Sequence, residues 1–484
     1  MLKGVIVLKS SAKVLVVLLL LMAALTAAPS YSFADNGDVP VSLVYEDGGS
    51  SVSAGTGFIR TGDLWVPMSA AEKMGVPVSA GPNGKGFIIS VREPAKVFAI
   101  PSLAELAGGY IPLYFSSAVS DGVSYFNITG MESVTGLTYT SDGSTAVIKK
   151  SAAQMQRVPS PQISPEKKIA LAWVRVSRSN PDIAAEPRIP GLNVLSPTWF
   201  NLMDGSGMSA NRASVSFVEE AHKKGYQVWA LASNGFSKSI TTQMFSSPKA
   251  MNLFIARLLI YAKLYNLDGI NIDFENVSEA DAESYVRFMS MLGARLKEQG
   301  IKSSVDVHVP GNSATSRSHS RAALSRYVDY VMLMAYDEHW RTCQTAGSVA
   351  SLPWVERAVQ NTIAEGVDRA KLVLGVPFYS RRWEETPVGG GKVKVKSYTL
   401  TMADAEALSA LRQAPPMWNE KTGQNFFMYS LNGKTYKIWM EDTASMEKRL
   451  ILVERYGLAG AAAWARGHEK LEIWNTIERI LNRQ

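Results

Sequence analysis

The chain of 484 residues is 46% hydrophobic and 19% charged, which excludes an intrinsically disordered protein and is typical of a globular one. Its net charge is +7, yet no block of Lys and Arg is dense enough for a nucleic-acid-binding arm, so we expect no nucleic-acid partner. The single cysteine, Cys343, excludes an intramolecular disulfide, and the five histidines lack the close spacing of zinc ligands. We therefore expect neither a metal nor another cofactor. The length predicts about two or three domains, or one large barrel with additions.

Residues 1–34 have the composition of an export signal. Three lysines, Lys3, Lys9 and Lys13, precede the apolar run VLVVLLLLMAALTAA, and small residues before Asp35 offer a cleavage site after Ala34. The apolar run is 15 residues long, whereas a membrane-spanning helix needs about 20. We therefore expect cleavage, no stable membrane span in the mature protein, and a secreted, extracellular or cell-wall-associated location. An uncleaved membrane anchor is the alternative, and the poverty in cysteine fits a bacterial envelope protein.

Residues 35–150 predict a small β-rich domain, because short alternating runs are separated by turn residues. A weak repeat with an offset of about 60 residues pairs LWVPMSAAEKMGVPVSAGPNGKGFIIS with SYFNITGMESVTGLTYTSDGSTAVIKK, each a strand, a helical turn, a Gly and a hairpin. The segments LWVPMSAAEKMG and GYIPLYF resemble the copper amine oxidase N-terminal-like domain, a stalk-type module of exported bacterial proteins. That resemblance implies a spacer or wall-contacting role. The region contains no His or Cys, so we expect no copper site.

The segment 151–167 carries Pro, Ser and Lys and is expected to be an extended, exposed linker. After it, short apolar strands alternate with amphipathic helices. The strand segments are IALAWVRV, LNVLSPTWF, YQVWALAS, LDGINIDFE, KSSVDVHVP, YVMLMAYD, KLVLGVPFY and LAGAAAWA. This alternation predicts an α/β fold, a (β/α)8 TIM barrel over residues 168–484. The connection after the seventh strand is too long for one helix, so we expect a small α+β insertion at about 380–442, with a hairpin at Asn432.

The fourth predicted strand carries a row of polar side chains. Its alternation places Asn271, Asp273 and Glu275 on one face and apolar residues on the other. Same-face neighbours in a strand lie about 7 Å apart, so Asp273 and Glu275 can reach one sugar-sized ligand. Both residues are at the C-terminal end of the strand, where such barrels have their active sites.

The segment DGINIDFE resembles the DxxDxDxE signature of glycoside hydrolase family 18, the chitinase-type retaining enzymes. The sixth strand segment, LMAYD, and Trp464 at the end of the eighth fall where that family has its Tyr-Asp pair and its floor tryptophan. The likeness covers roughly residues 168–484. Within the family, NIDFENV, LSPTWF, YDEHW, ASLPWVE and IWMEDTASMEKRL are most similar to the bacterial spore-cortex and cell-wall N-acetylglucosaminidase branch.

The resemblance implies retaining hydrolysis of β-1,4 linkages in glycans that contain N-acetylglucosamine, with the substrate's own acetamido oxygen as nucleophile. It implies that Glu275 is the general acid, that Asp273 holds the acetamido N–H, and that Tyr336 donates to the acetamido carbonyl. The remaining candidates, all for substrate binding, are Asp337, Trp464, Asn271, Asp268, Trp199, Ser233, Asn234 and Glu441. We expect a monomer whose partner is a glycan polymer, either peptidoglycan or chitin.

Several candidates have a structural alternative. Asp337 and Trp464 can be packing or capping residues, and Trp199 is either a sugar platform or a core residue. Asp306 and His308 alternate with valines and can face the barrel interior, where a satisfied structural pair is expected. A catalytically silent lectin on the same barrel is the non-enzymatic alternative, and the presence of an acid argues against it. The sequence leaves open endo or exo cleavage, and spore cortex or vegetative wall.

Asn271 departs from the family pattern, which has Asp at that place. The amide removes a negative charge beside Asp273 and introduces hydrogen-bond donors. With one like charge fewer, Asp273 is expected to ionise more readily, and its coupling to Glu275 to be the main remaining charge interaction.

Overall fold

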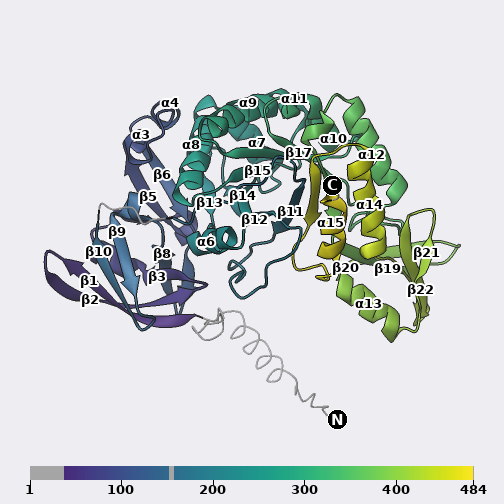
Figure 1. Cartoon of the computed structure of the whole chain (residues 1–484), viewed down its shortest axis with the longest axis horizontal. Helices are drawn as coiled ribbons and strands as arrows, with labels where there is room; N and C mark the ends of the chain where they lie inside the picture. The colour runs from purple at the N-terminus through teal and green to yellow at the C-terminus, as the bar shows by residue number, and fades with distance from the viewer. Residues whose placement is uncertain (1–37, 152–156, 483–484) are drawn as a thin grey trace, which may run out of the picture.

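The computed structural model describes residues 38–151 and 157–482, and its centre is a closed barrel of eight parallel strands (Figure 1). The barrel strands are β11 (Ile169–Val174), β12 (Val194–Leu202), β14 (Gln227–Ser233), β15 (Gly269–Asp273), β16 (Lys302–His308), β17 (Tyr330–Met334), β18 (Leu372–Pro377) and β24 (Gly460–Trp464). The barrel closes because β11 pairs with both β12 and β24. Seven of these strands lie within their predicted segments and β12 extends two residues beyond its own, so the predicted (β/α)8 barrel is confirmed.

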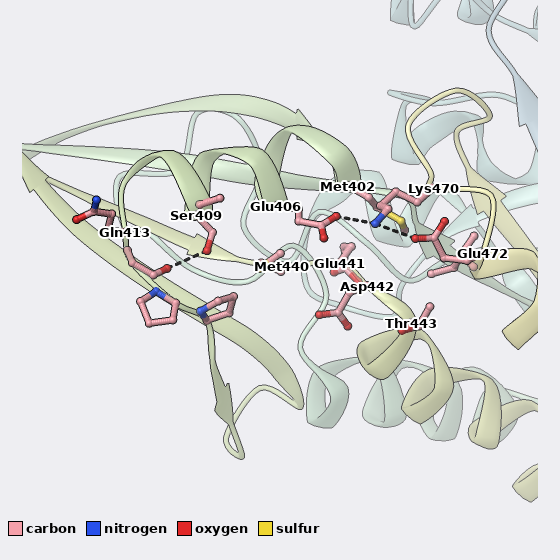
Figure 2. A pocket seen from close by; sticks show the side chains of 15 residues that line it. Met402, Glu406, Ser409, Gln413, Met440, Glu441, Asp442, Thr443, Lys470 and Glu472 are labelled. Atoms are coloured by element: carbon pink, nitrogen blue, oxygen red, sulfur yellow. Dashed lines mark hydrogen bonds and ion pairs between the residues drawn. The ribbon is translucent and has the colours of Figure 1, made fainter.

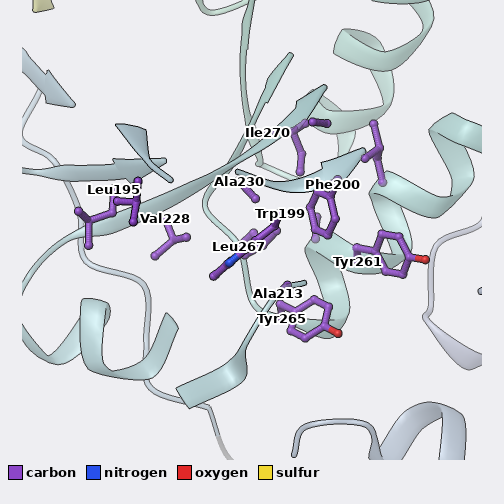
Figure 3. Close-up of a cluster of buried hydrophobic side chains, with 14 of the residues drawn as sticks. Leu195, Trp199, Phe200, Ala213, Val228, Ala230, Tyr261, Tyr265, Leu267 and Ile270 are labelled. Atoms are coloured by element: carbon purple, nitrogen blue, oxygen red, sulfur yellow. The ribbon is translucent and has the colours of Figure 1, made fainter. Parts of the chain in front are cut away.

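Helices surround the barrel and bury their apolar faces against the strands. They are α6 (Val215–Lys223), α7 (Lys238–Phe245), α8 (Pro248–Leu264), α9 (Ala282–Glu298), α10 (Ala314–Ser318), α11 (Arg321–Ser325), α12 (Leu352–Ala364), α14 (Thr443–Arg455) and α15 (Ile473–Leu481). Local sequence defines their starts: the Ser247 side chain accepts from the backbone N–H of Ala250, and Pro248 occupies the first turn of α8. Figure 3 shows part of the resulting core, between α8 and the strands that it covers.

The connection after β18 is an antiparallel sheet with one helix, as the sequence predicts. Its elements are β19 (Tyr379–Pro387), β20 (Val393–Thr401), α13 (Met402–Leu411), β21 (Met417–Asn419), β22 (Gln424–Leu431) and β23 (Lys434–Trp439). The strand order is β20-β19-β23-β22-β21. Asn432 and Gly433, with φ of 50° and 70°, form the turn between β22 and β23. In Figure 1 this insertion and the N-terminal region lie on opposite sides of the barrel.

The N-terminal region, which we call the N-terminal module (residues 38–151), contains two sheets. One has the order β7-β8-β3-β2-β1-β10-β9 and the other β4-β5-β6. Their strands are β1 (Val39–Asp47), β2 (Ser50–Arg60), β3 (Asp63–Pro67), β4 (Val78–Ala80), β5 (Phe87–Arg92), β6 (Tyr110–Phe115), β7 (Ala118–Ser120), β8 (Val123–Asn127), β9 (Leu137–Ser141) and β10 (Thr145–Lys150), with short helices α2 (Met68–Lys73), α3 (Pro94–Val97), α4 (Leu103–Ala107) and α5 (Glu132–Thr135). Both copies of the weak repeat form a strand, a helix and a hairpin: β3-α2-β4-β5 and β8-α5-β9-β10.

The N-terminal module is fixed to the barrel by buried contacts. The Tyr261 hydroxyl of α8 donates to the Tyr114 carbonyl at 2.9 Å, and Arg257 Nε donates to a backbone carbonyl of β6 at 3.0 Å. The Tyr261 ring also lies 6.1 Å from that of Phe115, and the hydrophobic core continues across the junction. The module is therefore packed on the barrel as part of one body.

The described part of the linker, residues 157–167, is exposed at some positions and half-buried at others. Beyond the undescribed residues 152–156, it lies along the N-terminal end of the barrel, and Val158, Ser160 and Ile163 are partly buried. The carbonyl of Val158 accepts a hydrogen bond from His222 Nδ1 at 3.2 Å. None of residues 157–167 is fully buried: Pro159, Gln162 and residues 164–167 are exposed, as expected of a linker, and the half-buried positions between them satisfy polar groups of the barrel floor.

The expected export signal, residues 1–34, lies outside the described residues. Within the part of the chain that the structure describes, no helix is long and apolar enough to cross a membrane.

Candidate active site

The polar row of the fourth barrel strand rises from the barrel interior toward its C-terminal mouth. Asn271 is fully buried, Asp273 is 7% exposed, and the side chain of Glu275, just beyond β15, is 31% exposed. On the opposite face, Phe274 is fully buried and its ring stacks on that of Phe288 of α9 at 5.5 Å. This packing holds the strand, so the three polar side chains keep their direction into the barrel mouth.

The main chain of Glu275 is held by a buried amide. The Glu275 N–H donates to Asn234 Oδ1 at 3.1 Å, and Asn234 Nδ2 donates to the Glu275 carbonyl at 2.7 Å. Asn234 Nδ2 also donates to Thr241 Oγ1 at 2.9 Å, which anchors it to α7. Asn234, a candidate for substrate binding, therefore acts on Glu275 through the backbone.

The carboxyl group of Glu275 is in a setting that retains a proton. Burial and the nearby charge of Asp337 raise the pKa of Glu275 to about 7. His308 Nε2 lies 3.4 Å from Glu275 Oε2. Burial and the charge of Arg321 lower the pKa of His308 to about 4, so the imidazole is neutral and the contact is no ion pair at neutral pH. A substantial fraction of Glu275 thus keeps its proton near neutral pH, as a general acid requires.

Asn271 forms hydrogen bonds to side chains of the neighbouring strand β16 and of strand β11. Its Nδ2 donates to Asp306 Oδ1 at 2.7 Å and to Ser304 Oγ at 3.0 Å, while its Oδ1 accepts from Trp173 Nε1 at 2.8 Å. Asp306 thus bonds to Asn271, whereas His308 Nε2 faces Glu275. The expectation that Asp306 and His308 form a satisfied pair is therefore wrong: they turn to different partners.

Asp273 has an unused acceptor. Among the described residues, its buried Oδ1 has no hydrogen-bond partner. Burial, followed by the charges of Glu275 and Asp306, raises the pKa of Asp273 well above its ordinary value. We expected the amide of Asn271 to leave Asp273 easily ionised, but desolvation outweighs the missing like charge.

Three aromatic rings lie together near this mouth: Tyr336 and Trp464 are partly exposed, and Trp173 is fully buried. The Trp173 ring lies 6.5 Å from that of Tyr336 and 6.2 Å from that of Trp464. Burial, followed by the charges of Asp306 and Asp273, raises the pKa of Tyr336, so its hydroxyl stays a hydrogen-bond donor. Trp464 at the end of β24 is partly exposed, as a stacking surface must be. Trp173 is an addition to the predicted set: it lies in the first strand segment, whose apolar run carries no catalytic pattern.

Asp337 follows β17 and points to the insertion. Its Oδ1 accepts from the Tyr379 hydroxyl at 2.6 Å and from Arg381 Nη2 at 3.0 Å. Within the described part, the buried Nε and Nη1 of Arg381 have no hydrogen-bond partner. Tyr379 and Arg381 were not predicted as site residues, although their place at the start of the insertion was a usable signal.

Ser233, at the end of β14, is partly exposed near the same mouth, and its Oγ donates to Asn201 Oδ1 at 3.3 Å.

Trp199 and Asp268 lie away from this mouth. Trp199 is fully buried, its ring contacts that of Phe217 at 5.2 Å, and its Nε1 donates to Asn180 Oδ1 at 2.6 Å. It belongs to the cluster in Figure 3 and is a core residue rather than a sugar platform. Asp268 precedes β15, where it accepts from the Val228 N–H at 2.6 Å and bonds His222 Nε2 at 2.9 Å. It therefore stabilises the N-terminal end of the barrel.

Glu441 is also an anchoring residue. It is 1% exposed and bonds Arg449 of α14 through both carboxylate oxygens, at 2.5 and 3.0 Å. It borders a cavity of about 740 Å³ between α13, residues 440–443 and the start of α15. Figure 2 shows this cavity, with Lys470 paired to Glu406 and Glu472 at its rim. This cavity is separate from the row that ends at Glu275.

Among residues 38–151 and 157–482, no group of three or more His, Cys, Asp or Glu side chains is arranged to hold a metal ion. The arrangement described above supplies a proton donor, a buried acceptor, a phenolic donor and an aromatic floor. Such a set can protonate a leaving group and orient an amide-bearing sugar.

Comparison with known proteins agrees with this geometry. The chain is 28% identical over 290 residues to the uncharacterized glycosylase YvbX of Bacillus subtilis, covering 57% of this chain and 80% of that protein. It is 30% identical over 237 residues to the putative sporulation-specific glycosylase YdhD of Bacillus subtilis, covering 48% of this chain and only 55% of that protein. In fold it is similar to the spore cortex-lytic enzyme SleL of Bacillus megaterium, with a TM-score of 0.58 and 21% identity over 66% of this chain and 75% of that one. Residues 217–469, more than half of the chain, match the family model of glycosyl hydrolases family 18, so the chain belongs to that family and is a glycoside hydrolase.

Proposed function

We propose that this chain is a secreted retaining β-N-acetylglucosaminidase that cleaves the peptidoglycan of a bacterial cell wall or spore cortex by substrate-assisted catalysis. The observation that carries this proposal is the placement of Glu275, with a pKa of about 7, above the buried and unpaired Oδ1 of Asp273. The names of the sporulation-specific and cortex-lytic relatives favour peptidoglycan as the substrate.

In the first step, Glu275 gives its proton to the glycosidic oxygen while the bond from that oxygen to the anomeric carbon breaks. The acetamido carbonyl oxygen of the same sugar forms a bond to the anomeric carbon, which yields an oxazolinium ion. Tyr336 is placed to donate to that carbonyl oxygen, and Trp464 offers its face to the sugar ring.

Asp273 binds the acetamido N–H group of the substrate. Its free Oδ1 accepts a hydrogen bond from that N–H, which orients the acetamido carbonyl oxygen toward the anomeric carbon. As positive charge develops on the oxazolinium, the ionised form of Asp273 is stabilised, and this interaction is stronger in the transition state than in the ground state.

In the second step, a water molecule attacks the anomeric carbon from the side that the leaving group vacated. The Glu275 carboxylate takes a proton from this water, the bond to the acetamido oxygen breaks, and the sugar keeps its configuration. The same residue thus acts first as an acid and then as a base, which a pKa of about 7 permits near neutral pH.

Digestion of purified peptidoglycan and of chitin oligosaccharides tests the proposal. We expect new N-acetylglucosamine reducing ends from peptidoglycan, and a loss of at least about 100-fold in kcat for Glu275→Gln, which keeps the shape but cannot give a proton. Cleavage of chitin oligosaccharides alone would assign the chain to chitin instead. Binding of both glycans without any turnover by the wild type would establish a lectin.

Export is tested by N-terminal sequencing of the protein recovered from the medium or wall of its host. A mature chain that begins at Asp35 is the expected result, and an intact Met1 in the membrane fraction would indicate an anchor.

A further inference from the structure

A second row of side chains runs beside the catalytic row, on the neighbouring strand β16. The register between β15 and β16 pairs Ile272 with Val305. Three residues further along each chain segment come Glu275, just beyond β15, and His308, the last residue of β16. Opposed residues of neighbouring strands point to the same face of the sheet, so His308 faces the barrel mouth together with Glu275.

The imidazole of His308 presents one ring nitrogen to the carboxyl group of Glu275. His308 Nε2 lies 3.4 Å from Glu275 Oε2. This nitrogen is buried and, among the residues that the structure describes, has no hydrogen-bond partner. An N–H···O hydrogen bond is about 2.7–3.2 Å long, so a small shift of either side chain completes the bond. Hydrogen bonds of catalytic groups are often long without substrate and shorten in the complex.

The ring of His308 is held in this orientation by a second histidine. The buried ring of His319 packs edge-on against it, with the ring centroids 5.1 Å apart. His319 is fixed in turn by two backbone carbonyls, that of Phe274 at 3.1 Å from its Nε2 and that of Thr315 at 3.1 Å from its Nδ1. Since Phe274 directly precedes Glu275, His319 supports both the chain segment that carries Glu275 and the ring that faces it.

The charges around this pair leave the proton on Glu275. Burial and the charge of Arg321 lower the pKa of His308 to about 4, against the opposite effect of Asp337. Burial and the charge of Asp337 raise the pKa of Glu275 to about 7. Further titratable groups that interact with the pair are Asp273, Asp306, His319 and Tyr336. Near neutral pH, His308 is therefore no general acid or base, but a neutral imidazole still has one N–H to donate.

We propose that His308 is a positioning residue for Glu275, whose Oε2 accepts a hydrogen bond from His308 Nε2–H. Oε1 is then the oxygen that carries the proton for the glycosidic oxygen. Once that proton has left, the same N–H donates to a carboxylate, and a hydrogen bond to a charged acceptor is the stronger one. His308 thus stabilises Glu275 most after the transfer, and itself gains or loses no proton in either step. The inference rests on the proposed function, in which Glu275 is the general acid.

Three variants of the full-length chain test this role. His308→Met removes the N–H donor, whereas His308→Gln keeps an N–H donor on a side chain of the same length as methionine. His222→Met is the matched control, because it removes a histidine that bonds a carboxylate, that of Asp268, at the opposite end of the barrel. The pH profiles of kcat and kcat/KM are measured on whichever of peptidoglycan and chitin oligosaccharides the wild type cleaves.

In His308→Met we expect the alkaline limb of the kcat/KM profile to move to higher pH by about one unit, because a carboxylate that has lost a donor forms less readily. The value of kcat at neutral pH is expected to fall about tenfold, with a change in KM of less than about twofold. His308→Gln should restore most of both effects. His222→Met should leave the limb in place even where it lowers the stability of the barrel.

Equal losses of kcat in His308→Met and His308→Gln, with the limb unmoved in both, would show that His308 only supports the fold and would overturn the proposal.

NMR of the wild type labelled with ¹⁵N-histidine tests the same contact without turnover. We expect His308 to carry its proton on Nε2 from pH 5 to pH 8, with a nitrogen chemical shift that follows the ionisation of Glu275 and no longer moves in Glu275→Gln. A His308 ring with its proton on Nδ1 would overturn the proposal. Failure of the proposed function gives a different result: the wild type cleaves neither glycan, while these spectra still decide whether His308 donates to Glu275.

Discussion

The substitution Asn271→Asp tests how the catalytic row tolerates a further carboxyl group. In the native chain, Asn271 is fully buried and its Nδ2 donates to Asp306 Oδ1 at 2.7 Å and to Ser304 Oγ at 3.0 Å. In the variant, an oxygen replaces that nitrogen. Two carboxyl oxygens can face each other at such a distance only if they share a proton, so the new group must take up a proton or move away.

The magnitude follows from these contacts. Losing a donor to a charged acceptor costs about 1.5–3 kcal/mol when both carboxyl groups are ionised. If the new carboxyl instead keeps its proton, its pKa in the folded state is raised above the unfolded value of about 3.9. The folded variant then binds more protons than the unfolded one. Its stability relative to wild type is therefore retained below about pH 4 and lost as the pH rises, by about 1.4 kcal/mol for each unit of raised pKa.

Denaturant unfolding from pH 4 to pH 8 measures this difference, with Asn312→Asp, an exposed position, as the control. We expect a growing loss of stability with pH for Asn271→Asp and none for the control. The profile of kcat/KM against pH should also shift upward at its alkaline limb, because the new carboxyl ionises as the pH rises and its negative charge then raises the pKa of Glu275 further. A stability difference that does not vary with pH, together with an unchanged profile, would refute the placement of Asn271 in contact with the titrating row.

Two further predictions concern residues around the row. Burial and the charge of Asp337 together raise the pKa of Glu275 to about 7, and Asp337→Asn removes that charge. The alkaline limb of the kcat/KM profile should therefore move to lower pH, by about one unit or less because burial is the larger cause. A limb that does not move would show that the two groups are not coupled. Trp199→Ala removes a fully buried side chain, so the free energy of unfolding should fall by about 3–5 kcal/mol. The KM for a short oligosaccharide, measured at low temperature, should stay unchanged. A large rise in KM with little loss of stability would mean that Trp199 contacts the substrate.

The barrel could be predicted from the sequence because each of its strands is a short apolar run followed by a helical pattern. The row at Asn271, Asp273 and Glu275 could be predicted for a similar reason, since strand alternation alone places the three on one face. The hairpin of the insertion was marked by Asn432-Gly433, residues that tolerate the positive φ of such a turn. In each case the signal is local, so neighbouring residues suffice to read it.

The contacts that orient the site are not local, and for that reason the sequence did not reveal them. Trp173 reaches Asn271 across the barrel, and Arg381 reaches Asp337 from the insertion. Asp268 belongs to the signature, but five residues of extended strand separate it from Asp273 by about 17 Å, which places it at the other end of the barrel. The pairing of β12 with β14 shifts register between Thr198 and Phe200, so simple alternation does not indicate which way Trp199 points.

The amide at Asn271 has a consequence for how protons are held in this row. It accepts from Trp173 Nε1 and donates to Asp306 Oδ1 at the same time, at 2.8 and 2.7 Å. An ionised Asp at this position could accept from Trp173 but could not donate to Asp306. A protonated Asp could do both, but only at a pH at which it keeps its proton. The amide makes both at every pH, so the link between the aromatic floor and Asp306 does not depend on titration. Burial raises the pKa values of Asp306, Asp273 and Glu275 alike, so these three carboxyl groups share the protons of the row and the pH dependence of the reaction should follow all three.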